Sequence, residues 1–427
     1  MGWADHAIWW HVYPLGFTGA PIREGSREST SPPRLDLVID WLDYAVELGV
    51  SGLLFGPFFF SSSHGYDTLD QYRIDPRLGT VDDFDRLLAE CKKRGLRVLL
   101  DGVFSHVGRE NPQVQRVLHE GPGSEDADLF DIDWDEPGGP APRVFEGHGA
   151  LVRLNHAHPA TAKYVSDVMT FWLDRGIDGW RLDAAYSVPA SFWAEVVPPL
   201  RSRFPEAWYL GEVIHGDYIK FVEESGVDSV TQYELWKAIW SALKDQNFFE
   251  LDWALKRNNE FLNHFVPNTF VGNHDVTRIA STVGPERALM AFAILMTVGG
   301  IPSIYYGDEQ GFTGVKEERE GGDDAVRPKM PDNPEGLPPS GAHLYTGHRD
   351  LIGLRRRHPW LATARTYPEL VENTRYIYRS VSADETHFLT VRLDLDGEGS
   401  CEILDKDANV LWAKKSGRPR GADPNPL

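Results

Sequence analysis

Short apolar runs alternate with helix-length amphipathic segments over most of this sequence. Runs of this kind predict buried strands, and strands that alternate with helices form a parallel sheet. Eight is the number of parallel strands that closes into a barrel. The sequence therefore predicts an α/β fold whose main part is a (β/α)8 TIM barrel. The eight runs are Ile8–Tyr13, Gly52–Phe55, Arg97–Val103, Gly179–Leu182, Tyr209–Val213, Ser229–Tyr233, Thr269–Gly272 and Ser303–Tyr306.

The segments between these runs have the apolar spacing of amphipathic helices. The rival architecture is an open, doubly wound sheet, which carries a Gly-x-Gly-x-x-Gly turn after an early strand. No such motif follows an early run, so the sequence favours the barrel. The clearest predicted helices are Leu35–Leu48, Val81–Arg94, Ala160–Arg175 and Pro285–Val298.

Two stretches interrupt the alternation. Residues 107–155 are rich in Gly, Pro, Asp and Glu, and a long irregular segment after a strand is usually functional. Later the apolar pattern has the period of antiparallel strands, at Arg375–Val381, His387–Leu395, Ser400–Leu404 and Asn409–Trp412. We predict a barrel over 1–106 and 156–364, a short insertion domain after the third strand over 107–155, and a small C-terminal antiparallel β domain over 365–427. Its polar tail from Ser416 is expected to be disordered.

The composition limits the partners and the compartment. The formal net charge of −21 repels phosphate backbones, so we predict no nucleic-acid partner. Only two cysteines occur, Cys91 and Cys401, which excludes a disulfide framework and fits a reducing compartment. No signal peptide is visible, and the most apolar stretch, Ala288–Val298, is too short to cross a bilayer. We therefore expect a cytoplasmic protein with no membrane association.

Polar and ionisable side chains gather where four of the predicted strands end. The carboxyl ends of barrel strands are where TIM-barrel proteins carry their chemistry. These segments are Asp101-Gly-Val-Phe-Ser-His106, Trp180-Arg-Leu-Asp183, Gly211-Glu-Val213 and Gly272-Asn-His-Asp275.

The four segments resemble, in order, the signature motifs of the α-amylase family of glycoside hydrolases. Two further stretches agree: His64-Gly-Tyr-Asp67 resembles the family's second-strand motif, and Gly300–Glu309 resembles its eighth-strand motif. The resemblance covers about residues 7–360. It implies a retaining α-glycoside hydrolase, an α-glucosidase or oligosaccharide-acting amylase, whose substrate is an α-1,4-linked maltooligosaccharide or related α-glucan.

The chemistry of these residue types supports the resemblance. Arg181 and Asp183 are two residues apart on a strand, so both side chains point into the barrel mouth. We expect the guanidinium to lower the pKa of Asp183 and keep it ionised, as a nucleophile requires. Nearby carboxylates should raise the pKa of Glu212, so that it can act as an acid. Retaining glycosidases use such a pair, about 5–5.5 Å apart.

The resemblance also implies individual roles. Asp183 would be the nucleophile, Glu212 the acid/base, and Asp275 the residue that holds sugar hydroxyls as the ring distorts. His106, His274 and Arg181 would line the same subsite, and Tyr66 would stack on the sugar ring. A purely structural role stays open for His106.

Asp67 follows Tyr66 directly, as in family members that act on short oligosaccharides. The resemblance implies that Asp67 pairs with an arginine after the eighth strand and closes the pocket behind the first sugar. Arg327 matches that arginine, with Arg319 as a competitor. The alternative is a structural salt bridge beside an open cleft. Trp134 or Phe145 could add a sugar platform, although core packing is favoured for both.

Many family members bind a structural calcium ion, and this sequence departs from their ligand pattern. Ser105 and Arg153 stand where the family carries an Asn and an Asp. Calcium prefers six to eight oxygen ligands, several of them charged, so a guanidinium opposes binding. A second calcium loop is also missing from Pro14–Pro33. We expect no obligatory metal and no cofactor.

Two other functions compete with hydrolysis. A transglycosylase would use the same machinery, with a sugar in place of water as the acceptor. A non-catalytic sugar-binding or scaffold protein would usually lose a catalytic carboxylate. This sequence keeps all three candidates, which disfavours that reading.

Overall fold

The structure is a computed structural model that describes residues 2–23 and 32–415 of the 427-residue chain. Its main sheet has eight parallel strands in the order β12-β11-β10-β5-β2-β1-β14-β13. A parallel bridge between Thr231, just past β12, and Asn268 of β13 joins the two ends of this order. The sheet therefore closes, and the predicted TIM barrel is confirmed.

All eight predicted runs form strands of this barrel, each within a few residues of its predicted limits. The strands are β1 Trp9–Val12, β2 Gly52–Phe55, β5 Arg97–Gly102, β10 Gly179–Leu182, β11 Trp208–Gly211, β12 Ser229–Val230, β13 Asn268–Phe270 and β14 Ile301–Tyr305. In the ladder between β5 and β10, Asp101 is the direct neighbour of Arg181. Neighbouring residues in register point to the same face of a sheet, so these two side chains lie together inside the barrel.

Helices surround the barrel. One of them, α4, begins at a capping box in which Thr80 and Asp83 hydrogen-bond each other's backbone N–H. The predicted helix Leu35–Leu48 is split at Trp41, whose fully buried ring packs against Phe17 and Tyr44. The longer helices are α2 Leu35–Asp40, α3 Leu42–Leu48, α4 Val81–Lys93, α6 Pro159–Arg175, α7 Ala190–Arg203, α8 Tyr218–Ser225, α9 Tyr233–Asp245, α10 Phe249–Phe261, α12 Pro285–Thr297 and α13 Ala342–Arg357.

The apolar helix α12 is buried along almost its whole length. It contacts α9 and α13 and also strands β17 (Phe388–Asp394) and β18 (Ser400–Leu404) of the C-terminal sheet. A helix that is apolar on all sides is one enclosed by other elements. Within residues 2–23 and 32–415, no helix has the length and apolar character needed to span a membrane.

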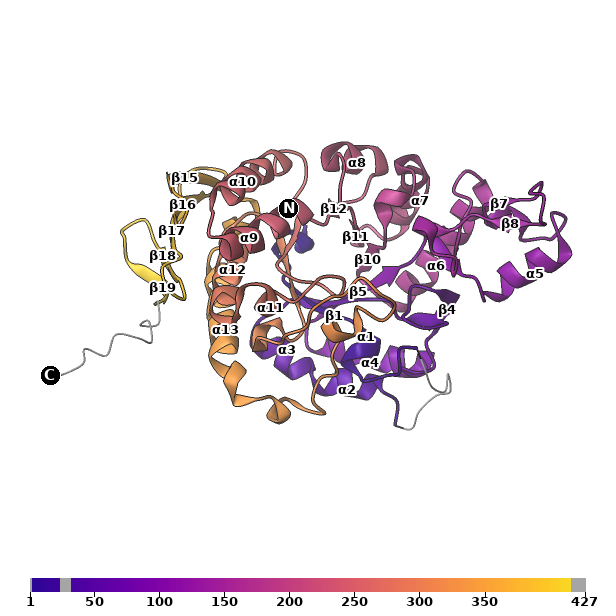
Figure 1. Ribbon diagram of the computed structural model, residues 1–427, viewed down its shortest axis with the longest axis horizontal. Helices are drawn as coiled ribbons and strands as arrows, with labels where there is room; N and C mark the ends of the chain where they lie inside the picture. Colours follow the sequence, from indigo (N-terminus) through magenta and orange to yellow (C-terminus); the bar gives the residue numbers. More distant parts are fainter. Residues whose placement is uncertain (1, 24–31, 416–427) are drawn as a thin grey trace.

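A hairpin-like pair of strands forms the base of the stretch predicted as an insertion. Strand β6 (His106–Gly108) pairs antiparallel with β9 (Leu151–Arg153). Between them lie α5 (Pro112–Glu120) and the short pair β7 (Ile132–Asp133) and β8 (Ala141–Pro142). Figure 1 shows these elements at one end of the molecule and the C-terminal sheet at the other.

The C-terminal sheet has five antiparallel strands in the order β15-β16-β17-β18-β19. Four of them match predicted strands: β16 (Arg375–Val381), β17, β18 and β19 (Val410–Lys414). The fifth, β15 (Arg365–Val371), was not predicted because Pro368 interrupts its pattern. It is an edge strand whose register shifts next to Pro368, which is where a sheet tolerates proline. The tail from Ser416, predicted to be disordered, lies outside the described residues.

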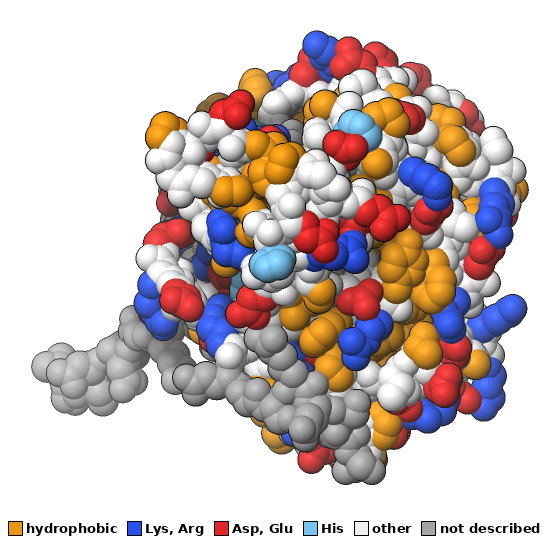
Figure 2. Space-filling view, turned by 90° about the vertical axis from the view of Figure 1, so that its right-hand side faces the viewer, with side chains coloured by type: hydrophobic (Ala, Val, Ile, Leu, Met, Phe, Trp, Pro, Cys, Tyr) orange, Lys and Arg blue, Asp and Glu red, His pale blue; other side chains and the backbone are white. Residues whose placement is uncertain are grey.

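A pair of strands next to the barrel was also missed. Strand β3 (Phe59–Ser61) pairs antiparallel with β4 (Thr68–Ile74) directly after β2. The turn between β3 and β4 holds the His64–Asp67 segment, so this hairpin carries a predicted motif to the barrel mouth. On the face that carries the insertion, acidic, basic and apolar side chains are intermixed (Figure 2).

Candidate active site

A cleft of about 1000 Å³ opens at the carboxyl ends of the barrel strands. All three predicted catalytic carboxylates line it, together with four of the predicted substrate-binding residues. The two remaining predicted residues, Arg181 and His274, are buried beside these carboxylates. The cleft-lining members of the predicted set are Tyr66, Asp67, His106, Asp183, Glu212, Asp275 and Arg327.

Arg181 is the centre of the polar cluster. Its Nη1 donates to both oxygens of Asp101, at 2.7 and 2.6 Å, and lies 3.3 Å from Oδ1 of Asp183. Its Nη2 lies 2.7 Å from Oε1 of Glu212. One buried guanidinium therefore holds three carboxyl groups, and it links Asp183 to Glu212.

Arg181 does act to lower the pKa of Asp183, but the expectation that it keeps Asp183 ionised is wrong for the ligand-free protein. Burial raises the pKa of Asp183 well above its usual range, and the charges of Glu212 and Asp101 raise it further. Arg181 acts in the opposite direction but does not outweigh them, because its shortest contacts go to Asp101 and Glu212. Burial also raises the pKa of Asp101 to about 6. The cluster thus favours retention of a proton near neutral pH.

Glu212 is held by neighbours on both sides. The backbone N–H of Ala184 donates to its Oε2 at 3.0 Å, and the Tyr233 hydroxyl donates to its Oε1 at 3.0 Å. Asn273 in turn donates to the Tyr233 hydroxyl at 2.9 Å. Ala184 has a left-handed backbone (φ 44°), which is rare for a residue with a side chain. That conformation coincides with the contact between the backbone after Asp183 and the Glu212 carboxyl.

Sequence reasoning missed Tyr233 and Asn273. A signal for both was available, because Tyr233 ends the sixth predicted strand and Asn273 lies inside the predicted Gly272–Asp275 segment. Hydroxyl and amide side chains at the ends of barrel strands therefore also indicate residues of the site.

Asp275 is the most exposed of the three carboxylates, at 32% of its side chain. Nη2 of Arg327 donates to its Oδ1 at 2.8 Å, and Nε2 of His274 lies 3.0 Å from its Oδ2. Arg327 is itself fixed by the backbone carbonyl of His274, at 2.9 Å from Nε, and by Asp323. Asp275 therefore presents an oriented carboxylate to the cleft.

Aromatic rings support this end of the cleft. The ring of His274 is nearly parallel to the rings of Tyr13 and Tyr66, with centroid distances of 5.7 and 5.6 Å. Tyr66 also hydrogen-bonds His274 and donates to Asp101 at 3.2 Å. Burial keeps the pKa of His274 well below its usual range, so its imidazole is neutral at pH 7. His11, 3.1 Å from His274, belongs to the same network.

His106 is buried but reaches the cleft wall. Its Nε2 lies 3.0 Å from the Tyr66 carbonyl, and its Nδ1 lies 2.7 Å from the Ser105 hydroxyl. Burial lowers the pKa of His106 to about 3, so it is uncharged at pH 7. Phe145 packs against it at 4.6 Å and also lines the cleft. The preference for core packing was therefore wrong for Phe145, whereas Trp134 does pack against the core.

Asp67 and Arg327 do not form the expected ion pair. Asp67 accepts hydrogen bonds from the backbone and the hydroxyl of Ser63, at 3.0 and 2.5 Å. Arg327 pairs instead with Asp275 and with Asp323. The competitor Arg319 pairs with Glu317 on the exposed loop after β14. Two of these contacts are local, because Ser63 lies four positions before Asp67 and Asp323 lies four positions before Arg327.

The residues at the family's calcium position do not suit calcium. Ser105 is engaged with His106, and Arg153 stands opposite His106 in the ladder between β6 and β9. A hydroxyl and a guanidinium in place of an amide and a carboxylate remove oxygen ligands and add repulsion. Across residues 2–23 and 32–415, no group of three or more His, Cys, Asp or Glu could hold a metal ion.

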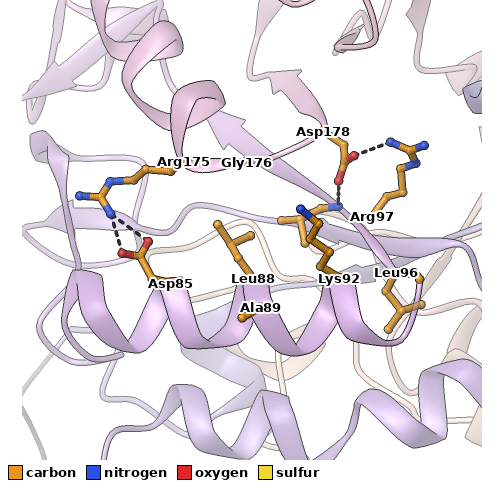
Figure 3. Close-up of a pocket in the computed structure, with 11 residues that line it drawn as sticks. Asp85, Leu88, Ala89, Lys92, Leu96, Arg97, Arg175, Gly176 and Asp178 are labelled. Carbon is orange, nitrogen blue, oxygen red and sulfur yellow. Dashed lines mark hydrogen bonds and ion pairs between the residues drawn. The ribbon is translucent and has the colours of Figure 1, made fainter.

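A second pocket, of about 700 Å³, lies at the opposite ends of the strands (Figure 3). Four of its charged groups form two ion pairs: Arg175 with Asp85, and Arg97 at the start of β5 with Asp178 just before β10. In TIM barrels this end contributes to stability and the other end carries the chemistry. The cleft that contains Asp183 and Glu212 is therefore the candidate active site.

Comparison with known proteins identifies the family. The family model for the alpha amylase catalytic domain matches residues 27–376. A maltogenic alpha-amylase of Bacillus acidopullulyticus is 32% identical over 387 residues, which are 84% of this chain and 64% of that protein. A cyclomaltodextrinase of Geobacillus thermopakistaniensis is 31% identical over 382 residues, which are 83% of this chain and 63% of that protein.

Solved structures agree with these sequence matches. The structure of a cyclic alpha-maltosyl-(1→6)-maltose hydrolase from Arthrobacter globiformis, in complex with that sugar, superimposes with a TM-score of 0.79 at 25% identity. The match covers 92% of this chain and 91% of the other. The chain spans less than two thirds of the length of the two relatives named above. The family model, in contrast, covers most of the chain, which therefore belongs to the alpha-amylase family of glycoside hydrolases.

Proposed function

We propose that this protein hydrolyses α-1,4-glucosidic bonds in short maltooligosaccharides with retention of anomeric configuration. The observation that carries the proposal is the link through Arg181, which joins Asp183 and Glu212 at the wall of one cleft. Two carboxyl groups at such a site are what a retaining glycosidase requires.

In the first step, an oxygen of Asp183 forms a bond to the anomeric carbon while the bond from that carbon to the glycosidic oxygen breaks. Glu212 gives its proton to the departing oxygen. The proton that the cluster retains must therefore reside on Glu212 when substrate is bound. Substrate promotes this state because the developing positive charge on the sugar ring stabilises an ionised Asp183.

In the second step, a water molecule attacks the anomeric carbon and gives a proton to Glu212. The bond between that carbon and Asp183 breaks, and Asp183 leaves as a carboxylate. Both residues return to their starting protonation states. Ala184 N–H and the Tyr233 hydroxyl fix Glu212 on the side where the leaving oxygen and the water must lie.

The other end of the cleft suits the sugar that is transferred. Asp275, oriented by Arg327 and His274, can accept hydrogen bonds from sugar hydroxyls. Tyr66 offers a ring edge and face beside it, and neutral His106 can exchange hydrogen bonds without adding charge. The sequence assigned the closure of the pocket behind the first sugar to an ion pair between Asp67 and Arg327. In this proposal the ion pair between Arg327 and Asp323 closes the pocket instead.

The substrate class rests on the relatives. One is named a maltogenic alpha-amylase, another a cyclomaltodextrinase, and the neighbouring structure is named as a hydrolase of a cyclic maltosyl-maltose. All three names refer to enzymes that act on α-linked glucose oligomers.

We also propose that the insertion at 107–155 forms part of the cleft wall. We further propose that the protein is cytoplasmic, where the buried, unpaired thiols of Cys91 and Cys401 would stay reduced.

Two substitutions test the proposal. Asp183→Asn and Glu212→Gln should each lower kcat on maltotriose by roughly a thousandfold or more, with an unchanged melting temperature to within a few degrees. Asp85→Asn, in the second pocket, is the matched control and should leave kcat unchanged. Proton NMR should detect the α-anomer first among the products. Activity within about tenfold of wild type in either cluster variant, or β-anomer as the first product, contradicts the proposal.

Transfer to a sugar acceptor is the second candidate function. It needs the same covalent intermediate and differs only in the second step, where a sugar hydroxyl replaces water as the group that attacks the anomeric carbon and gives its proton to Glu212. The cleft wall on the Glu212 side carries Tyr186 and Glu146, polar groups that a sugar could contact. Longer oligosaccharides formed from concentrated maltotriose would identify this activity.

A further inference from the structure

Three side chains at the ends of neighbouring barrel strands form a hydrogen-bonded chain that ends at Glu212. Glu212 follows β11, Tyr233 follows β12 as the first residue of α9, and Asn273 follows β13. These strands are consecutive around the closed barrel. Nδ2 of Asn273 lies 2.9 Å from the Tyr233 hydroxyl oxygen, and that oxygen lies 3.0 Å from Oε1 of Glu212. The chain therefore connects three adjacent strand ends.

The direction of each hydrogen bond in this chain follows from its far end. The backbone N–H of Asp275 can only donate, and its nitrogen lies 2.9 Å from Oδ1 of Asn273. The other polar group of the Asn273 amide is therefore the NH2 group, which donates to the Tyr233 oxygen. The hydroxyl has a single hydrogen, and that hydrogen is directed to Oε1 of Glu212. A backbone group beside one carboxylate of the site thus sets the hydrogen-bond direction at another.

The Tyr233 hydroxyl keeps its hydrogen in the folded protein. Burial raises the pKa of Tyr233 well above its usual range, and the charges of Glu212 and Asp275 raise it further. Arg181 and the hydrogen bond from Asn273 act in the opposite direction but do not outweigh them. Tyr233 is therefore a hydrogen-bond donor to Glu212 near neutral pH.

The two oxygens of Glu212 have different surroundings. Oε1 accepts the Tyr233 hydrogen and lies 2.7 Å from the positively charged Nη2 of Arg181. Both neighbours present hydrogens to Oε1, and a guanidinium has no acceptor. Among the residues that the structure describes, Oε2 accepts a hydrogen bond from the backbone N–H of Ala184 alone. A proton on Glu212 is therefore disfavoured at Oε1 and has a free site at Oε2.

We propose that Asn273 and Tyr233 are positioning residues that confine the transferable proton of Glu212 to Oε2. This proposal rests on the proposed function and deepens it. In the first step the bond between Oε2 and its proton breaks as the proton bonds to the glycosidic oxygen. In the second step Oε2 takes a proton from water. Oε1 keeps the Tyr233 hydrogen bond in both steps, and that bond stabilises the carboxylate that the first step creates.

The test uses two substrates whose leaving groups depend on an acid to different degrees. The sugar oxygen that leaves maltotriose must be protonated, whereas fluoride leaves α-glucosyl fluoride as the anion of a much stronger acid. Tyr233→Phe removes the hydroxyl with little change in shape. The ratio of kcat/KM for maltotriose to kcat/KM for α-glucosyl fluoride should then fall roughly tenfold, as the loss of a hydrogen bond to a charged group implies.

Asn273→Asp tests the link before Tyr233. The new carboxylate still accepts from the backbone N–H of Asp275, but it also accepts the Tyr233 hydrogen and draws it away from Glu212. The ratio should therefore fall in this variant as well. Adding Asn273→Asp to Tyr233→Phe should change the ratio by no more than about twofold, because both changes remove the same hydrogen bond. This double variant also tests a direct contact between Tyr233 and the sugar, which Asn273→Asp would not share.

A pH profile separates positioning from a purely structural role. Both single variants should move the alkaline limb of kcat/KM for maltotriose to higher pH, because the ionised form of Glu212 has lost a donor. Tyr376→Phe is the matched control, because the Tyr376 hydroxyl in β16 donates to Oδ1 of Asp252 at 3.1 Å, outside the cleft. This control should change neither the ratio nor the pH profile.

The outcomes separate this proposal from the proposed function. If wild type cleaves both substrates and the ratio in Tyr233→Phe stays within about twofold, the positioning role is refuted while the proposed function stands. An equal fall for both substrates with an unmoved alkaline limb also refutes it, because that result denotes a structural role. A fall in the Tyr376→Phe control equal to that in Tyr233→Phe overturns it too. If wild type cleaves neither substrate, the proposed function fails and this inference fails with it.

Discussion

Replacing Asp101 with asparagine tests how burial sets the protonation of the cluster around Arg181. Asp101 is fully buried, and burial raises its pKa to about 6 although Arg181 acts to lower it. Between pH 4 and 6 the folded protein therefore keeps a proton that the unfolded chain has lost. Stability must fall as the pH rises through this window and level off above it.

The size of this effect follows from the pKa difference. A rise from 3.8 to about 6, at about 1.4 kcal/mol per unit, is worth roughly 3 kcal/mol. Unfolding entropy of about 2.1 cal/mol/K per residue makes this a shift of roughly 3 °C for a chain of 427 residues. Asparagine does not titrate, so Asp101→Asn should gain roughly 3 °C on wild type between pH 4 and pH 7.

The same substitution should change the pH profile of catalysis. Asp101 raises the pKa of Asp183 by charge repulsion, so its neutralisation should move the acid limb of kcat/KM to lower pH. The assay pairs melting curves with kcat/KM for maltotriose at half-unit steps from pH 4 to pH 8.

Asp308 provides the matched comparison. Burial raises its pKa to about 6 as well, but its partner is Arg278, outside the cluster. Asp308→Asn should show the same trend in melting temperature and no shift of the acid limb. A melting difference between wild type and Asp101→Asn that stays constant from pH 4 to pH 7 would refute the reasoning.

Three further predictions concern the cleft and its surroundings. Asp275→Asn should lower kcat/KM on maltotriose by roughly a hundredfold, because the carboxylate proposed to accept from sugar hydroxyls is neutralised and its pair with Arg327 is weakened; a loss below tenfold would contradict its role. Asp67→Ala should cost no more than about tenfold, because its partner is Ser63 and not Arg327; a much larger loss would mean that Asp67 contacts the sugar. EDTA should leave both activity and melting temperature unchanged, because Arg153 opposes a cation; a fall in melting temperature that calcium restores would show the opposite.

Local pattern determined most of the architecture. Apolar runs and helical spacing depend on neighbours in the chain, so the sequence predicted all eight barrel strands and four strands of the C-terminal sheet. Two-residue spacing on a strand also sets side-chain direction, which is why Arg181 and Asp183 were expected in the barrel mouth. Strand β15 escaped prediction because proline is acceptable only on an edge, and sequence pattern does not identify the edge of a sheet.

The chemistry of the cleft depended on contacts that no local pattern contains. From the sequence, Arg181 could have paired with Asp183 alone. In the structure, the register of β5 and β10 places Asp101 beside Arg181, and Glu212 at the end of β11 also pairs with it. Burial by distant segments then decided the direction of the Asp183 pKa, against the sequence expectation. Charge pairing and desolvation are properties of the packed structure, because they depend on which groups share a buried volume. The sequence determined which residues reach the cleft, and only the tertiary structure decided which of them form ion pairs and hydrogen bonds with one another.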